Sequence, residues 1–186
     1  MPALIFCREA ARANISALAA VLALVLLLPV FAAGSAHADG KPLVLEDYFR
    51  GRTVGEGVFE SRIAGIRRPF TVVTQGSWNP KTFTLRLRED FRFADGERDT
   101  KVWFFQKVAE NRYIGTRSDV LNPVTITTGG PSISFDYAAE LATGDGPVAV
   151  RFFDTLTRVD ARTVRNTADV RKYGITVGTV DLTFRR

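Results

Sequence analysis

Three carboxylates interrupt segments of the sequence that otherwise alternate between apolar and polar residues. Glu89 lies in the segment TFTLRLREDFRF, Asp119 follows GTRS, and Asp154 lies in PVAVRFFDTL. An acid on an apolar face costs several kcal/mol unless it is paired. Arg117 shares its strand face with Asp119, and we expect it to meet the charge of an inward-facing Glu89.

These charged residues permit three different functions. An arginine and a few acids inside a fold can orient the polar head group of a ligand. Two carboxylates with separated pKa values could serve a paired-acid hydrolase. The same residues could also form an internal ion network that is purely structural. Trp103, Tyr137 and Phe152 lie on apolar strand faces and would either line a binding space or fill the core.

The only histidine, His37, and the only cysteine, Cys7, lie near the N-terminus. Residues 1–38 have a basic start, an apolar run over 17–31 and an Ala-His-Ala ending, which is the layout of a secretory signal. Cleavage after Ala38 would leave no imidazole and no thiol. The mature chain could then build no Ser-His-Asp or Cys-His pair and no His-ligated zinc. We therefore expect no metal, no cofactor and no enzymatic activity.

The signal defines the expected organisation and location. Residues 1–38 are the predicted signal peptide and residues 39–186 a single β-barrel domain in the periplasm or outside the cell. The alternative is an inner-membrane anchor formed by an uncleaved helix. The formal net charge is +5 for the whole chain. Positive and negative residues are interspersed, so we expect no nucleic-acid partner, and the oligomeric state stays open.

Apolar residues alternate along several segments of the mature chain. In residues 82–93, Phe83, Leu85, Leu87, Phe91 and Phe93 share one parity, and Asp-Gly follows as a hairpin signal. A parity change at Gly178 predicts a β-bulge. The expected helical segments are a turn at Leu45–Phe49 and a short piece at Ala168–Tyr173.

Several short strands separated by turn signals indicate a sandwich or a barrel. A barrel is favoured because closure removes exposed sheet edges. We therefore predict an all-β, antiparallel up-and-down barrel of about eight to ten strands, preceded by the signal-peptide helix. Barrels of this size are filled by side chains or hold one small ligand.

Several segments resemble the bacterial domain of unknown function 3833 family. They are LEDYFRG, RRPFTV, LREDFRFADGE, GTRSDV and the ending NTADVRKYGITVGTVDLTFRR, and the resemblance spans residues 43–186. It implies an envelope protein with a calycin-like or lipocalin-like barrel and brings no established activity. Family members often carry a lipoprotein cysteine at the cleavage site. This chain has none there, so no lipid anchor is implied.

Two functions follow from these observations. The first is a periplasmic barrel that binds or carries a hydrophobic small molecule, such as a fatty-acyl group or another lipid. Its predicted ligand-binding residues are Glu89, Trp103, Arg117, Asp119, Tyr137, Phe152 and Asp154. The second is an envelope structural or interaction protein with a filled core and no ligand. Contact with a membrane is expected only transiently or through an uncleaved signal.

Overall fold

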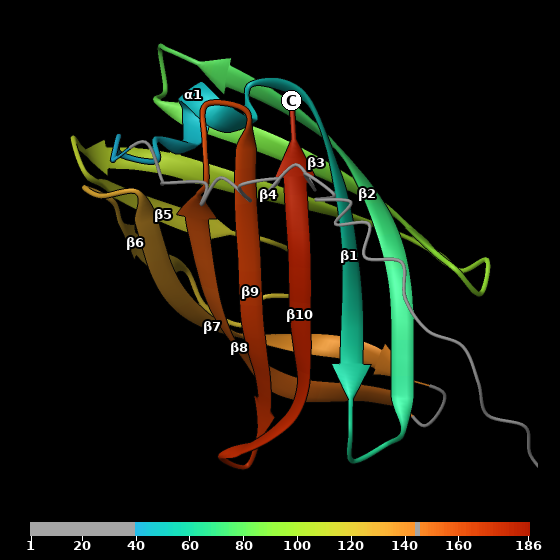
Figure 1. The fold of residues 1–186 in the computed structure, drawn as a ribbon. Helices are drawn as coiled ribbons and strands as arrows, with labels where there is room; N and C mark the ends of the chain where they lie inside the picture. The colour runs from blue at the N-terminus through green and yellow to red at the C-terminus, as the bar shows by residue number, and fades with distance from the viewer. Residues whose placement is uncertain (1–39, 144–145) are drawn as a thin grey trace, which may run out of the picture. The chain divides into compact units, whose positions relative to one another are not determined.

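A computed structural model describes residues 40–143 and 146–186, so the predicted signal peptide lies outside the described residues. The described chain begins with one short helix and continues as ten strands (Figure 1). The elements are α1 (Leu45–Phe49), β1 (Gly51–Ser61), β2 (Ile66–Asn79), β3 (Thr84–Phe93), β4 (Arg98–Ala109), β5 (Arg112–Thr116), β6 (Val124–Thr127), β7 (Ser132–Thr143), β8 (Gly146–Arg158), β9 (Thr163–Lys172) and β10 (Ile175–Arg185).

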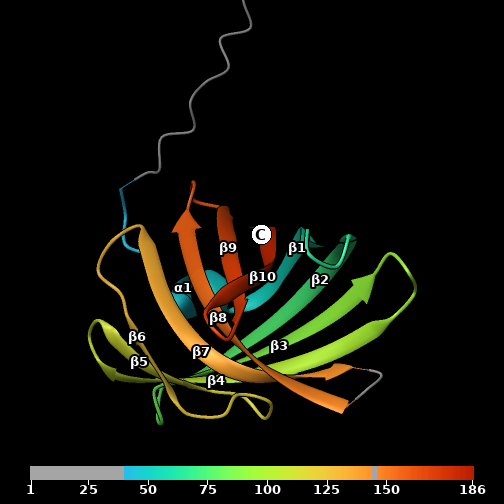
Figure 2. The ribbon, with the colours of Figure 1, turned by 90° about the horizontal axis from the view of Figure 1, so that it is seen from below.

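The strands form one antiparallel sheet in the order β6-β5-β4-β3-β2-β1-β10-β9-β8-β7. All neighbours are consecutive in sequence except β1 and β10, which pair from Val54 with Arg185 to Glu60 with Thr179. The sheet curls until its two edge strands approach one another (Figure 2). The prediction of an antiparallel up-and-down barrel of eight to ten strands is confirmed.

The segment that follows β5 closes the barrel against β7. Val120 and Ala139 form an isolated antiparallel bridge. The Leu121 amide donates to the Ala138 carbonyl at 2.9 Å, and the Glu140 amide donates to the Asp119 carbonyl at 2.9 Å. A closed barrel would have a continuous ladder of backbone hydrogen bonds at this junction. Since only these bonds connect the segment to β7 in the described chain, the barrel is nearly, and not fully, closed.

Most strands lie where the alternation in the sequence predicted them, and two local predictions are wrong. The bulge predicted at Gly178 is present as a register shift after Thr176. Phe83 was expected on the buried face, but β3 begins only at Thr84, so Phe83 lies in the preceding turn and is 57% exposed. The helical piece expected at 168–173 is wrong, because this segment pairs with strands on both sides as the end of β9 and a turn.

Helix α1 covers one end of the barrel (Figure 1). The short helical turn predicted at this place is confirmed, and its side chains Leu45, Tyr48 and Phe49 are buried. The Tyr48 hydroxyl lies 3.1 Å from the Phe184 carbonyl oxygen, to which it can donate, and the Phe49 and Phe184 rings meet edge to face at 5.3 Å. The helix therefore ties the start of the domain to the end of β10.

Candidate functional site

On strands β1, β3 and β10, burial of the inward-facing side chains falls with distance from α1. Along β3, Leu85 and Leu87 are buried, whereas Glu89, Phe91 and Phe93 are partly exposed. Strand β10 repeats the pattern, with Phe184 and Leu182 buried and Val180 partly exposed, and on β1 Thr53 is buried whereas Phe59 is partly exposed. Phe70 on β2, Val150 on β8 and Val170 on β9 stay buried at the same distance from α1. The interior is therefore packed tightly beside α1 and is accessible along β1, β3 and β10 toward the opposite end, which we call the open end.

Three of the predicted aromatic residues meet inside the barrel. The rings of Trp103 on β4 and Tyr137 on β7 are 5.3 Å apart and nearly perpendicular. Tyr137 also stacks on Phe152 of β8 at 5.2 Å. Strands β4 and β7 are not paired in the sheet, so the first contact crosses the interior. These rings form an apolar wall of the site.

The Arg117 side chain lies against this wall, directly after β5. Its guanidinium carbon is 4.5 Å from the Trp103 ring centre and 5.4 Å from that of Tyr137. Its Nε donates to Asp119 Oδ1 at 2.5 Å, and Lys101 Nζ lies 2.9 Å from Asp119 Oδ2. Within the described residues, no acceptor is bonded to the two terminal nitrogens of Arg117.

The predicted pairing of Arg117 with Glu89 is wrong in detail. Glu89 faces inward as expected, but the ion-pair partner of Arg117 is Asp119, two residues away on the same side of the chain. The charge of Arg117 still lowers the pKa of Glu89. Burial and repulsion by Asp154 and Asp119 outweigh that effect and raise the Glu89 pKa to about 7.

Asp154 is the most deeply placed acid of the site, with only 6% of the residue exposed. Burial raises its pKa to about 6, although a hydrogen bond from Asn166 Nδ2 at 2.8 Å and the nearby Tyr137 hydroxyl oppose the rise. Its Oδ2 atom receives no well-aligned hydrogen bond from the described residues. Glu89 and Asp154 are therefore two acids that change protonation close to neutral pH.

The structure brings all seven predicted site residues into one cluster. Two further members were missed, Lys101 on β4 and Asn166 on β9. Both carried a signal in the sequence: Lys101 shares the strand face of Trp103, and Asn166 interrupts the apolar series Val164, Ala168 and Val170 as the acids interrupt theirs.

A sequence profile described as "Protein of unknown function (DUF3833)" matches residues 31–186. The chain belongs to the DUF3833 family. This match confirms the family resemblance seen in the sequence. The description of the family gives no function. A comparison of this DUF3833 chain with curated proteins gives no match.

Two solved structures resemble the DUF3833 barrel. A protein of unknown function of the DUF3598 family from Nostoc punctiforme is 11% identical, with a TM-score of 0.54 over 79% of this chain and 50% of that one. An S-type phycobiliprotein lyase from Guillardia theta is also 11% identical, with a TM-score of 0.54 over 77% of this chain and 93% of that one. The DUF3833 chain thus spans about half of the DUF3598 protein, and both likenesses show a calycin-like fold.

Neither a metal centre nor a membrane-spanning helix is found in the described part of the DUF3833 chain. Within residues 40–143 and 146–186, no group of three or more His, Cys, Asp and Glu side chains is arranged to hold a metal ion. The same residues include no helix that is long and apolar enough to cross a bilayer.

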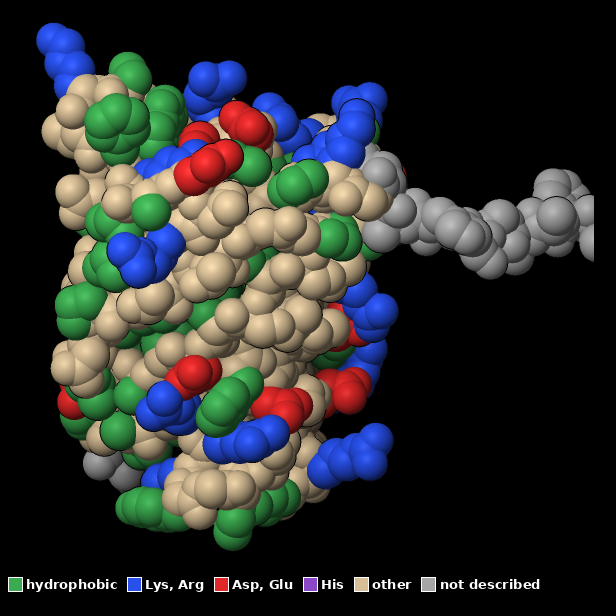
Figure 3. All heavy atoms as spheres, turned by 90° about the vertical axis from the view of Figure 1, so that its left-hand side faces the viewer, with side chains coloured by type: hydrophobic (Ala, Val, Ile, Leu, Met, Phe, Trp, Pro, Cys, Tyr) green, Lys and Arg blue, Asp and Glu red, His purple; other side chains and the backbone are tan. Residues whose placement is uncertain are grey.

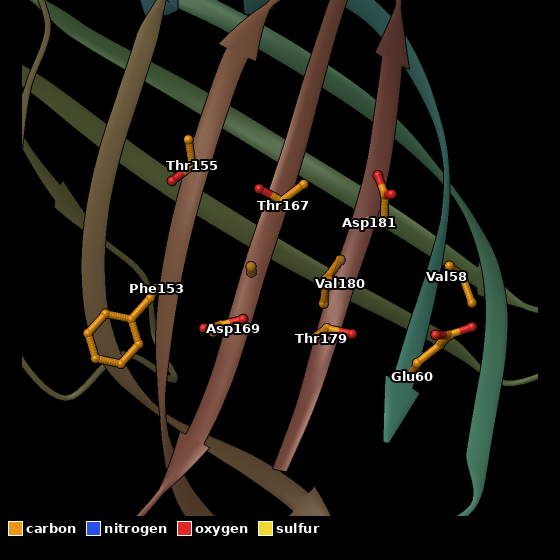
Figure 4. A pocket seen from close by; sticks show the side chains of 10 residues that line it. Val58, Glu60, Phe153, Thr155, Thr167, Asp169, Thr179, Val180 and Asp181 are labelled. Carbon is orange, nitrogen blue, oxygen red and sulfur yellow. The ribbon is translucent and has the colours of Figure 1, made fainter. Parts of the chain in front are cut away.

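An open depression of about 640 Å³ lies on the outer face of β1, β8, β9 and β10 of the DUF3833 barrel (Figure 4). Its lining is mostly polar and includes Thr155, Thr167 and Asp181. Phe153 at its edge is covered by the Arg171 guanidinium at 4.4 Å. The strand alternation places this depression on the opposite side of the sheet from Glu89 and Asp154, so it is separate from the candidate site.

The two acids predict how the stability of the DUF3833 barrel depends on pH. Their pKa values in the folded state, about 7 for Glu89 and about 6 for Asp154, lie above the ordinary values of 4.5 and 3.8. The folded state then holds more protons than the unfolded state in this range, so stability should fall as pH rises from about 4.5 to 7. In the Glu89→Gln variant, the free energy of unfolding should fall by roughly 2 kcal/mol less over this pH range, a value that allows for the partial exposure of Glu89.

Urea unfolding at a series of pH values between about 4.5 and 7.5 measures this slope. The matched control is Glu140→Gln, which changes an exposed glutamate on β7 and should leave the slope as in the wild type. A Glu89→Gln variant with an unchanged slope would show that Glu89 does not titrate in this range.

Proposed function

We propose that this barrel binds a hydrophobic small molecule, such as a fatty-acyl group or another lipid, through its open end. The observation that carries the proposal is the change in burial along the interior. Phe59, Phe91 and Phe93 point inward far from α1 and keep accessible surface, whereas the inward-facing residues of the same strands near α1 have almost none. An interior that served only as a core would be expected to bury its aromatic rings at both ends.

The apolar body of the ligand would lie among the partly exposed rings. These are Phe59, Phe91, Phe93, Tyr137 and Phe152. Removing an acyl chain from water contributes about 0.8 kcal/mol for each buried CH₂ group. Such a site selects ligands by the length and shape of their apolar part, and a few polar groups of the protein fix the orientation of the ligand.

The polar end of the ligand would meet Arg117 and Glu89. Arg117 offers its two terminal nitrogens, which are free of other acceptors in the described residues, on a side chain held by Asp119 and two aromatic rings. Glu89 makes no hydrogen bond to the described residues, and its raised pKa leaves it substantially protonated near neutral pH. A carboxylate or carbonyl group would suit this pair of donors.

A catalytic function is the second candidate, because Glu89 and Asp154 have raised pKa values suited to proton transfer. The name of the structural neighbour from Guillardia theta, a phycobiliprotein lyase, supports this second candidate. The proposed location of the present chain is the periplasm or the cell exterior, based on its predicted signal peptide. Lipids of the envelope would be available there.

Titration of the delipidated full chain with a fluorescent fatty acid tests the proposal. Val180→Trp would narrow the open end, because Val180 packs inward on β10. Val58→Trp is the matched control, because Val58 lies on the outer face of the adjacent strand β1. We expect saturable binding by the wild type, a loss of affinity of at least about tenfold for Val180→Trp, and a change within about twofold for Val58→Trp.

Absence of saturable binding by the wild type at tens of micromolar would favour a structural protein with a filled core. Equal losses in both variants would place binding outside the barrel. Mass spectrometry of the recovered fatty acid distinguishes the second candidate function, because a carrier returns the molecule unchanged and an enzyme would alter it.

A further inference from the structure

Half of the large hydrophobic side chains that are strongly exposed in the described residues lie on two hairpins. Ile63 and Ile66 belong to the β1–β2 hairpin and are 72% and 47% exposed, and Tyr173 and Ile175 belong to the β9–β10 hairpin and are 92% and 62% exposed. Both hairpins lie at the end of the barrel opposite α1 (Figure 1). We call these four residues the apolar tip.

The two hairpins that carry the apolar tip are held side by side. Their strands β1 and β10 are paired up to Glu60 and Thr179. Beyond that pair, the Ser61 hydroxyl donates to the Val177 carbonyl at 2.6 Å. The four exposed side chains therefore project from one continuous part of the surface, beside the open end.

Tyr173 occupies a backbone position that is costly for its residue type. It has φ 52°, and Gly174 beside it has φ 80°, so both residues of this tight turn are left-handed. Such turns usually carry Asn, Asp or Gly, so tyrosine is held here at a conformational cost, as Phe83 is in the turn before β3. Tyrosine is a residue that favours the boundary between water and lipid.

Cationic side chains surround the apolar tip. Within the described residues, Arg62 and Lys172 have no acidic partner, and the Lys172 ammonium lies 5.4 Å from the Tyr173 ring centre. Neighbouring Arg67 and Arg171 are already paired with Glu60 and Asp169. Hydrophobic side chains gather at the lower end of the molecule with Lys and Arg beside them (Figure 3). This surface is complementary to an anionic one.

We infer that the apolar tip docks on the surface of an anionic lipid bilayer, with the open end of the barrel turned toward the lipids. Isoleucine, tyrosine, arginine and lysine side chains together match the headgroup and upper acyl region of a bilayer. Protruding hairpin ends can enter that region, whereas a protein partner would need a hollow shaped to receive them. The inference does not depend on the proposed ligand, although docking would bring the open end to a source of lipid.

A site-specific fluorescent label tests the docking in the full chain. In a Cys7→Ser background, Tyr173→Cys places an environment-sensitive NBD label on the apolar tip. Val108→Cys is the matched control, because Val108 is 45% exposed on β4, next to Lys107, whose ammonium reaches Glu46 of α1 at 2.7 Å. With vesicles of phosphatidylglycerol and phosphatidylcholine, we expect a several-fold rise and a blue shift of emission at 173 only.

Arg62→Glu combined with Lys172→Glu should abolish the response at position 173, and vesicles of phosphatidylcholine alone should give little of it. Equal responses at 173 and 108 would mean that another segment holds the chain on the membrane, which overturns the inference. No response at 173 to anionic vesicles would also overturn it, and a response only to added envelope proteins would identify a protein partner instead.

Discussion

Replacing Arg117 with methionine should cost the barrel about 3–5 kcal/mol of stability, because one member of a largely buried ion network would be removed. The Arg117 side chain is only 9% exposed, and it holds the carboxylate of Asp119 together with Lys101. Its loss would leave Asp119, Glu89 and Asp154 with one cation instead of two. Methionine keeps most of the volume against Trp103, so the loss reports mainly on charge. Urea unfolding at pH 7.5 measures it.

A second variant separates charge from packing at this position. Combining Arg117→Met with Asp119→Leu removes both partners of the ion pair, and should recover most of the lost stability. The single variant should also raise the pKa of Glu89 further, since Arg117 lowers that pKa in the native protein. A loss below about 1 kcal/mol in the single variant, the usual range for exposed pairs, would show that the network is solvated.

Gly76→Ala should destabilise the domain by about 3 kcal/mol or more, although it adds a single methyl group. A Cβ atom at this position would lie 1.9 Å from the carbonyl oxygen of Phe49 and 3.3 Å from the Cα of Arg50. These are backbone atoms at the end of α1, so no side-chain rotation can relieve the contact. We expect α1 to move away from the barrel end, and the amides of 45–50 to exchange hydrogen faster in mass-spectrometric measurements.

Gly130→Ala is the matched control, because no atom lies within 4 Å of the Cβ it would add. Gly130 also contributes to the same end of the molecule, where its carbonyl accepts a hydrogen bond from the Leu43 amide at 2.9 Å. Stability within about 0.5 kcal/mol of the wild type is expected for this variant. If Gly76→Ala proved equally mild, α1 would be less firmly seated than its buried side chains indicate.

The sequence was sufficient to predict the sheet because each strand carries its own alternation. Leu85 and Leu87 face inward as their parity required, and Gly178 marks a true bulge. The segment at 168–173 misled because alanine, arginine and lysine favour helices. Pairing with β8 and β10 overrides that preference, and only the three-dimensional arrangement shows it.

The members of the candidate site could be predicted, but not their pairing. An acid on an apolar parity is visible in a sequence, which is why Glu89 and Asp154 were found. The pairing of cations with acids depends on the distances between strands across the barrel interior. The alternation of apolar and polar residues in the sequence gives no information on these distances. Lys101 reaches Asp119 from β4, and Arg117 takes the acid two residues away, so the expected Glu89 pair did not form.

The junction between β1 and β10 has a consequence for how the chain folds. Strands β1 to β6 and β7 to β10 are two meanders whose pairings are local in sequence, whereas Val54 meets Arg185 only after most of the chain has been made. Contacts at such separation carry a large loop-closure entropy and slow folding. The two meanders should therefore form early and join late. Until they join, the apolar inner face of each is open to intermolecular association.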